Sequence, residues 1–521
     1  MLPLPVPLVN AMIWRNYRPN TQRLRIGVLI DDYRVPDWIF QALTLLESEP
    51  ALDLTAILIH DQPLGPPPKR PALFRLLQDA SLKRADVLNP FHDLTGFVKR
   101  LADAPALDIL VRFDTASLHG PSTQFAKFGV WSIGLGESPD VPYFKEVKNQ
   151  APVSVLGLRH HPKSMDEPIP FYDYRAPTVQ GLCFTKNSVE PCRMAGLILL
   201  DRLLDVAARG YASVICQIDS SLAAAGDRSE PTDLSCFGFV LRRSARSISG
   251  RLRSRNRFLR WVIAIRAKNE RAFREIPAPT GHGHADPFLL EWNGNDYLLM
   301  EDVPLDGLGR LAAMKISPDG TLGEPELILE RPYHLSYPFV FQNGSDLFLI
   351  PESANNRTVE LYRAGVRAPF EWHFEKHLFE GAMLVDTTVF HHDGIWYFFT
   401  TQVDYGMRAY LFYADSLDGE WKYHPRNPIC SDVARSRGAG KLFYRNGRLL
   451  RPAQDCSVRY GYAIVLNEVR KLSRTEYEES PIERLEPSWW GPLSWRNANL
   501  GTHTLNASAR WEVTDGLRLR L

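Results

Sequence analysis

The first third of the chain alternates short apolar runs with amphipathic stretches. The spacing predicts a helix over Trp38–Glu47. The runs that predict strands are Arg25–Ile30, Leu54–Ile59, Leu107–Phe113, Gly129–Gly134 and Val153–Leu158. Such alternation is typical of a mostly parallel, doubly wound α/β sheet. Ligands of these sheets bind beyond the carboxyl ends of the strands, which here carry Asp31, Asp32, Asp61 and Asp114.

A different period governs the second half, where one pattern recurs four times. The start of an innermost strand is followed seven residues later by an Asn-Gly or Asp-Gly pair and then by a second apolar strand. The starts are Asp286, Ser336, Asp386 and Ala439, and the pairs begin at Asn293, Asn343, Asp393 and Asn446. These pairs are 50, 50 and 53 residues apart. Hairpin turns at this period predict a β-propeller, in which equivalent positions of all blades face one central funnel.

Two further segments complete the predicted ring. Residues 501–513, followed by a turn at Asp515-Gly516, are expected to form a fifth blade. A strand over Trp261–Arg266 precedes the first repeat and is expected to close the ring. We therefore predict five blades.

A helix-rich connector is expected between the two parts, with Met194, Leu197 and Leu200 at helical spacing. Between Leu241 and Arg274 the sequence has twelve arginines and lysines and one acidic residue, Glu270. A run of this kind is typical of a solvated connector, and it could also contact an anionic membrane surface. The predicted division is 1–22 as an extension, 23–190 as the α/β domain, 191–258 as the connector and 259–521 as the propeller.

Composition narrows the classes of function. The chain has 61 basic and 60 acidic residues, which argues against a dedicated nucleic-acid binder. Its six cysteines show no CxxC spacing and indicate reduced thiols, so we expect a cytoplasmic protein without a zinc site. The apolar opening fits a signal peptide poorly, and no other apolar run is long enough to predict a membrane helix. We predict neither a metal nor a cofactor.

Carboxylates at the strand starts suggest a site. Asp286 and Asp386 would face the same axis, and paired carboxylates serve glycosyl chemistry as base or nucleophile and as acid. The alternative is that each caps backbone N–H groups locally. Glu352 is a third catalytic candidate. The candidates for substrate binding are other polar residues at strand ends: His284, His334, Arg451, Gln454, Asp455 and His503.

The Asp286-Pro-Phe start resembles the five-bladed propeller glycosidases of the arabinanase, xylosidase and invertase type. That resemblance implies a base or nucleophile at Asp286 and an acid near Asp386, with Ser336 at a position where the family has a pKa-tuning Asp.

A second resemblance covers roughly residues 260–521. It rests on His284-Ala-Asp-Pro-Phe, Pro351-Glu-Ser, the 451–457 stretch and Gly501-Thr-His-Thr-Leu. These stretches are similar to the amino-terminal propeller of plant glucosamine inositolphosphorylceramide transferases, which implies glycoconjugate synthesis.

The strand series and the Gly129–Gly134 stretch resemble the formyltransferase fold. The Asn and His that this fold uses map onto Ser132 and Gly134, so the family's dyad is absent. His119, or His160 with His161, could substitute. Without the dyad the resemblance implies a ligand-binding or supporting domain.

The sequence therefore favours a carbohydrate-active enzyme that transfers glycosyl groups in glycoconjugate or surface-polysaccharide assembly, with a sugar or nucleotide sugar bound in the propeller funnel. Three alternatives remain. They are a propeller-type glycoside hydrolase, a non-catalytic sugar- or partner-binding propeller, and an N-formyltransferase acting on a nucleotide-linked amino sugar.

Overall fold

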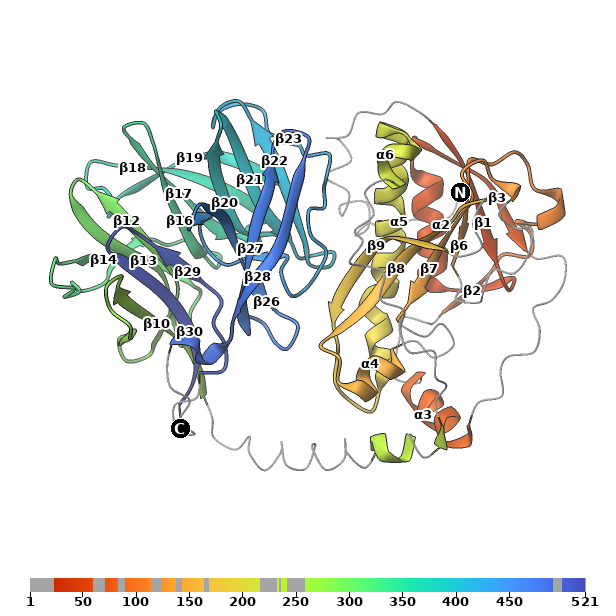
Figure 1. The fold of residues 1–521 in the computed structure, drawn as a ribbon, viewed down its shortest axis with the longest axis horizontal. Helices are drawn as coiled ribbons and strands as arrows, with labels where there is room; N and C mark the ends of the chain where they lie inside the picture. Colours follow the sequence, from red (N-terminus) through yellow and green to blue (C-terminus); the bar gives the residue numbers. More distant parts are fainter. Residues whose placement is uncertain are drawn as a thin grey trace. The chain divides into compact units, whose positions relative to one another are not determined.

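The protein is described by a computed structural model that comprises two units. The described residues are 23–59, 71–82, 90–113, 124–136, 143–163, 168–215, 232–233, 236–240, 258–490 and 499–520. Contacts divide the chain into Met1–Arg253 and Ser254–Leu521 (Figure 1). The predicted extension 1–22, Asp61, Asp114, His119 and residues 241–257 of the basic segment lie outside the described residues.

The first unit is built on a seven-stranded sheet. Its strands, in spatial order, are β5 (Val98–Arg100), β3 (Leu52–Ile59), β1 (Leu24–Ile30), β6 (Ile109–Arg112), β7 (Val130–Leu135), β8 (Val153–His161) and β9 (Ile169–Pro177). The five strands from β5 to β7 run parallel. Strands β8 and β9 are antiparallel to their neighbours.

We predicted a mostly parallel, doubly wound sheet. The observed sheet is mixed, since β8 and β9 run antiparallel to their neighbours, and a doubly wound arrangement stays a prediction. The β8–β9 connection spans residues 162–168. A parallel connection needs about a dozen residues or more to cross the sheet, so this short loop returns the chain antiparallel. The order of the strands does not by itself establish a formyltransferase-like domain, which stays a prediction.

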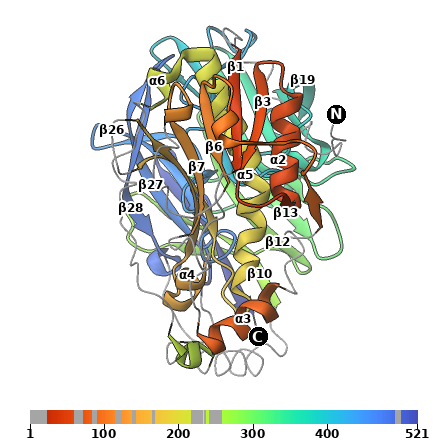
Figure 2. The same ribbon diagram turned by 90° about the vertical axis from the view of Figure 1, so that its right-hand side faces the viewer.

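The described helices of this unit are α2 (Asp37–Ser48), α3 (Ala72–Leu82), α4 (Phe144–Asn149), α5 (Val189–Arg209) and α6 (Tyr211–Ile215). The long helix α5 lies beside α2 (Figures 1 and 2). A Cβ on Gly196 would lie 2.9 Å from the Cβ of Ala42, so glycine permits this close approach. Helix α5, which the sequence placed in a connector, thus packs within the first unit. A small ladder pairs β2 (Arg34–Pro36) with β4 (Phe91–Asp93).

The second unit is a five-bladed β-propeller. Blade one contains β12 (His282–Trp292), β13 (Asn295–Pro304), β14 (Arg310–Ile316) and β15 (Glu326–Leu329). Blade two contains β16 (Ser336–Asn343), β17 (Asp346–Ser353), β18 (Thr358–Ala364) and β19 (Trp372–Glu380). Blade three contains β20 (Leu384–His392), β21 (Ile395–Gln402), β22 (Arg408–Ala414) and β23 (Lys422–Tyr423).

Blade four has a divided inner strand, β24 (Arg437–Gly438) and β25 (Phe443–Arg445), followed by β26 (Arg448–Asp455), β27 (Ala463–Leu472) and β28 (Tyr477–Leu485). Blade five joins both ends of the propeller segment. It contains β29 (Leu505–Ala507), β30 (Trp511–Arg520), β10 (Phe258–Ala267) and β11 (Arg274–Ile276). Because β10 pairs with β30 along its whole length, the prediction that Trp261–Arg266 closes the ring is confirmed.

The predicted hairpin turns occur in blades one to four, and in blade two the turn lies one residue later than predicted. In blades one, three and four both turn residues have positive φ, for example Asn293 (49°) and Gly294 (73°), as a type I′ turn requires. In blade two Asn343 pairs with Asp346, so the turn is Gly344-Ser345, one residue later than predicted. The predicted fifth turn at Asp515-Gly516 is wrong, because both residues lie inside β30.

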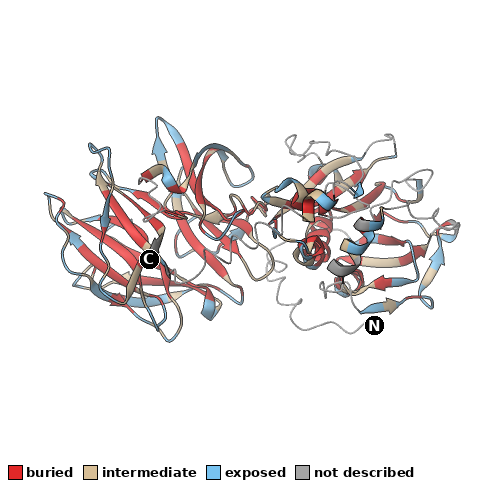
Figure 3. Ribbon diagram, turned by 90° about the horizontal axis from the view of Figure 1, so that it is seen from below, coloured by how far each residue is buried: buried red, intermediate tan, exposed pale blue. Residues whose placement is uncertain are grey.

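Apolar side chains fill the space within and between blades. Figure 3 shows buried residues concentrated in the strands and exposed residues in the connecting loops. One cluster joins Ile263 and Val513 of blade five to Leu298 and Met300 of blade one. This packing locks the ring-closing blade against its neighbour and so fixes the strand starts near the axis.

Candidate functional site

Three inner strands each contain one residue with a left-handed backbone at an equivalent position. Asp286, Tyr337 and Asp386 have φ of 48°, 45° and 51°, and at each the register with the second strand shifts. These are β-bulges, which redirect side chains near functional sites. The equivalent of Asp286 in blade two is therefore Tyr337, and the predicted equivalence of Ser336 is wrong. The cause is the shifted Gly344-Ser345 turn.

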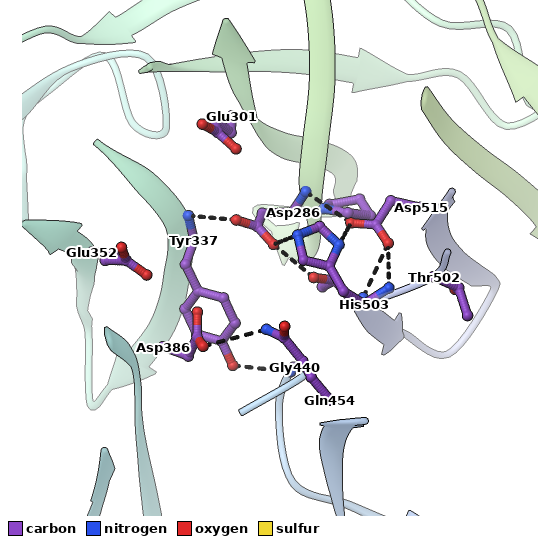
Figure 4. A network of polar contacts seen from close by, with 12 residues as sticks. Asp286, Glu301, Tyr337, Glu352, Asp386, Gly440, Gln454, Thr502, His503 and Asp515 are labelled. Atoms are coloured by element: carbon purple, nitrogen blue, oxygen red, sulfur yellow. Dashed lines mark hydrogen bonds and ion pairs between the residues drawn. The ribbon is translucent and has the colours of Figure 1, made fainter. Parts of the chain in front are cut away.

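Asp286 is held on both carboxylate oxygens. Its Oδ1 accepts a hydrogen bond from Thr504 Oγ1 at 2.6 Å and lies 3.4 Å from His503 Nε2. Its Oδ2 accepts from the backbone N–H of Tyr337 at 3.1 Å. Asp286 is 4% exposed, so this carboxylate lies buried between blades one, two and five, as Figure 4 shows.

A second carboxylate, Asp515, stands behind His503. Asp515 Oδ2 lies 2.5 Å from His503 Nδ1 and accepts the backbone N–H of Asp286 at 3.2 Å. Burial alone would lower the pKa of His503, but the charges of Asp515 and Asp286 outweigh it and raise this pKa to about 9. His503 is therefore an imidazolium at neutral pH.

Asp386 and Glu352 form the other half of the site and share one cation. Arg437 Nε donates to Asp386 Oδ2 at 2.5 Å, and Arg437 Nη2 donates to Glu352 Oε2 at 3.3 Å. Burial raises the pKa of Asp386 well above its usual range, against the opposing charge of Arg437. Burial also raises the pKa of Glu352. Two carboxylates beside one guanidinium titrate as a pair, and this pair retains a proton more readily than free carboxylates do.

Further polar groups border these carboxylates. Glu301 Oε1 lies 2.9 Å from His334 Nε2, and burial raises the pKa of Glu301. Gln454 Nε2 donates to Asp386 Oδ2 at 3.3 Å. Tyr460, 46% exposed, places its ring 4.7 Å from the Arg437 guanidinium. This aromatic face is the type of surface on which sugar rings stack.

The structure brings most of the sequence-predicted residues together, and in three of them the side chain pairs with a residue outside the carboxylate group. Arg451 forms a buried bidentate pair with Glu479, at 2.7 and 2.6 Å. Asp455 pairs with Arg484. His284 is 1% exposed and lies 3.5 Å from Asp302.

Four residues of the site escaped the sequence reasoning: Glu301, Arg437, Tyr460 and Asp515. Glu301 pairs with Ala285 across the sheet and Glu352 pairs with Ser336, so the same blade position carries both glutamates. An alignment of second strands by that position would have found Glu301. Asp515 was not predicted as a site residue because an Asp-Gly pair is typical of turns, and Asp515-Gly516 was assigned to one.

One group of described residues has a spacing that a metal ion could use. The ligand atoms of Asp286, His503 and Asp515 lie within 4.8 Å of one another. A cation there would displace the proton on His503 and compete with the N–H donors on both carboxylates.

The first unit carries a smaller polar group on adjacent strands. Ser132 Oγ lies 2.8 Å from His161 Nε2, and Arg112 lies beside Ser132 in register. Burial, with the charges of His160 and Arg112, lowers the pKa of His161 to about 4. His160 Nε2 donates to the carbonyl oxygen of Phe128 at 3.0 Å and lies 2.5 Å from the hydroxyl of Tyr211. Asp31 lies 3.5 Å from Arg112 at the strand ends.

One family model matches the segment that carries this site. Residues 271–516 match the family model described as Glucosamine inositolphosphorylceramide transferase 1, N-terminal. This stretch contains every carboxylate of the site described above.

Curated relatives share the same name. Glucosamine inositolphosphorylceramide transferase 1 of Arabidopsis thaliana is 36% identical over 221 residues, covering 40% of this chain and 29% of the relative. The protein of that name in Oryza sativa subsp. japonica is 32% identical over 249 residues, covering 45% and 33%. The chain thus matches about a third of the length of these relatives.

Solved structures with a similar shape are glycoside-hydrolase propellers. The GH43 BlXynB protein from Bacillus licheniformis is 17% identical with a TM-score of 0.31, covering 39% of this chain and 45% of that one. An exo-1,5-alpha-L-arabinanase from a bovine ruminal metagenomic library is 11% identical with a TM-score of 0.32, covering 44% and 94%. Within the described residues, every helix is too short or too polar to span a bilayer.

Proposed function

We propose that this protein transfers glycosyl groups during the assembly of a glycoconjugate or surface polysaccharide, and that the sugar binds in the propeller funnel. The observation that carries the proposal is that one segment, 271–516, holds both the carboxylate site and the match to a transferase family. The ligand is a sugar or nucleotide sugar. We place the reaction in the cytoplasm, with the basic segment 241–274 as a contact for an anionic membrane surface.

The carboxylates suit opposite roles because their surroundings differ. Asp286 accepts hydrogen bonds from Thr504 and the backbone of Tyr337 and lies beside His503. Burial raises the pKa values of Glu352 and Asp386, so this pair retains a proton more readily than free carboxylates do. We therefore assign Asp286 as the base and the Glu352–Asp386 pair as the acid.

The proposed step uses both. The acceptor hydroxyl attacks the anomeric carbon while its proton passes to Asp286. The bond from the anomeric carbon to the leaving oxygen breaks, the electron pair goes to that oxygen, and the Glu352–Asp386 pair supplies its proton. Proton exchange with solvent then restores both groups. Arg437 compensates the negative charge left on the pair.

The test is transfer of a radiolabelled sugar from nucleotide sugars to lipid and oligosaccharide acceptors by the purified chain. Asp286→Asn and Asp386→Asn should each lower turnover about 100-fold or more, the scale of a lost acid or base. Asp393→Asn is the matched control, because Asp393 lies in a hairpin turn of the same blade where asparagine is favoured. Equal turnover in all three variants would refute a catalytic funnel.

Hydrolysis is a second candidate, because a carboxyl pair with raised pKa values also suits the general acid that cleaves an unactivated glycoside. Its readout is the release of reducing sugar from oligosaccharides without an added acceptor. Sugar binding that persists in all variants without any turnover would instead support a non-catalytic binding propeller.

A further inference from the structure

His503 lies between two carboxylates from different strands. Its Nδ1 is 2.5 Å from Asp515 Oδ2 in β30, and its Nε2 is 3.4 Å from Asp286 Oδ1 in β12. Each ring nitrogen therefore lies within ion-pair distance of a carboxylate, and both carboxylates favour the imidazolium. His503 has no nitrogen left to bind a substrate while this arrangement holds.

Asp515 accepts hydrogen bonds from three backbone N–H groups. It is fully buried, and its Oδ1 accepts the backbone N–H groups of His503 at 2.8 Å and Thr504 at 3.1 Å. Its Oδ2 also accepts the N–H of Asp286, at 3.2 Å. Asp515 thus holds the backbone of the first-blade aspartate and the ring of the histidine at the same time.

The other side of the imidazole is covered by aromatic rings. Trp261 stacks on His503 with ring centres 4.0 Å apart and planes inclined by 24°. Gly461 makes this possible, since a Cβ there would lie 2.8 Å from the Trp261 ring and 2.9 Å from His503 Cβ. Tyr460 meets the His503 ring edge to face at 5.5 Å. The ring therefore cannot turn away from the two carboxylates.

We propose that Asp515 and His503 are positioning residues that hold Asp286 in the orientation of a base at the floor of the funnel. The inference rests on the proposed function for the role of Asp286, but the arrangement itself can be tested without any substrate. It assigns His503 to the support of the base and not to contact with the sugar. It also gives a function to Asp515, which touches Asp286 only through its backbone.

The contact between His503 and Asp286 depends on the protonation of His503. His503 is faced by Asp286 and Asp515 and more distantly by Asp386 and Glu301, all acidic. These charges raise its pKa to about 9, so the imidazolium persists through neutral pH and is lost as the pH rises through 9. Above that pH Asp286 loses the cation beside Oδ1, and turnover should fall along the same titration curve.

Trp261 offers a direct readout, because a protonated imidazole stacked on an indole quenches its fluorescence and the neutral ring quenches it less. We expect wild-type emission to rise with a midpoint near pH 9. Trp261→Phe and His503→Gln should both abolish this transition. His373→Gln, which removes an exposed histidine of blade two, is the matched control and should leave it unchanged.

Asp515→Asn decides the role of the second carboxylate. The substitution keeps an oxygen acceptor but removes the charge, so the midpoint should move down by about one pH unit or more. The alkaline limb of turnover, or of sugar binding, should move with it. Asp515→Glu, which restores the charge, should bring the midpoint back toward the wild-type value.

Two results would overturn the proposal: a fluorescence transition that survives His503→Gln, or a midpoint that Asp515→Asn leaves in place. If Asp515→Asn does not fold, the wild-type midpoint still decides, since a value near the ordinary pKa of histidine would exclude a doubly paired imidazolium. Because these measurements need no sugar, they succeed or fail separately from the proposed transfer reaction.

Discussion

Glu352 and Asp386 lie on neighbouring blades and share the guanidinium of Arg437, at 3.3 and 2.5 Å. This places one cation between two buried carboxylates, so removal of the cation has a larger effect than removal of an ordinary ion pair. Four consequences of the structure can be measured.

Replacement of Arg437 by glutamine should destabilise the fold by about 3–5 kcal/mol, the usual cost of an uncompensated buried charge. The loss should shrink as the pH falls toward 4. The pKa values of Glu352 and Asp386 are raised in the folded state, so their stabilising effect is present below the unfolded values of 4.5 and 3.8 and is lost as the pH rises. Urea denaturation at several pH values measures this. Arg445→Gln, at an exposed pair with Glu483, is the control. An equal loss at all pH values would contradict the shared pair.

Arg451→Met should destabilise the fold by a similar amount, about 3–5 kcal/mol, because it leaves Glu479 buried without its partner. Burial alone would raise the pKa of Glu479, but Arg451 holds it below its usual range. The contribution of the pair is therefore present above pH 4.5 and is lost as the pH falls through the folded pKa. Adding Glu479→Leu should restore much of the stability. Arg474→Met, at an exposed pair with Asp415, should change little.

Because of Lys441, the free energy of unfolding should rise with pH between about 8 and 10.5. Burial lowers its pKa to about 8 from 10.5, so the unfolded chain binds more protons between these values and stability increases with pH across them. Lys441 Nζ donates to the carbonyl of Leu289 at 3.2 Å. Lys441→Met should remove the alkaline rise, measured by thermal unfolding from pH 7 to 10.5. Lys471→Met, at an exposed lysine whose pKa is raised by Glu476, should not remove it.

Tyr460→Ala should weaken sugar binding about tenfold, a loss of about 1.4 kcal/mol, because it removes a ring that is 46% exposed beside Arg437. The matched control is Tyr444→Ala, which removes a tyrosine of the same blade that is 58% exposed and has a described contact with His392, outside the site. Calorimetric titration of both variants with the preferred sugar makes the comparison. Equal affinities would place the sugar away from Tyr460.

The repeat pattern revealed the propeller because each blade carries its own local hairpin signal. Asp286 and Asp386 could be assigned to the axis for the same reason. Contacts between distant segments left no such signal. Arg437 meets Glu352 over 85 residues, and His503 meets Asp286 from the opposite end of the propeller segment. The register of blade two was also misjudged, since Asn343-Gly344 fits a type I′ turn by sequence although the chain turns one residue later.

The first unit shows the limit of periodicity more clearly. The apolar run of β8 has the composition of a buried strand, and composition does not distinguish the direction of a strand. Only the length of the following connection indicated that β9 returns antiparallel.

The buried salt bridge of Arg451 illustrates a related limit. An arginine near a strand end gives the same sequence pattern whether it binds a ligand or, as here, a glutamate 28 residues away.

The pairing of β10 with β30 has a consequence for biosynthesis. The ring closes between strands that are separated by more than 240 residues, and a ribosome delivers β30 last among the propeller strands. His503 and Asp515 belong to that final blade, whereas Asp286 emerges much earlier. The carboxylates of the early blades therefore remain without their imidazolium until synthesis of the propeller segment is finished. Assembly of the funnel floor therefore coincides with completion of the ring, and a nascent chain that lacks β30 lacks Asp515 and its hydrogen bond to Asp286.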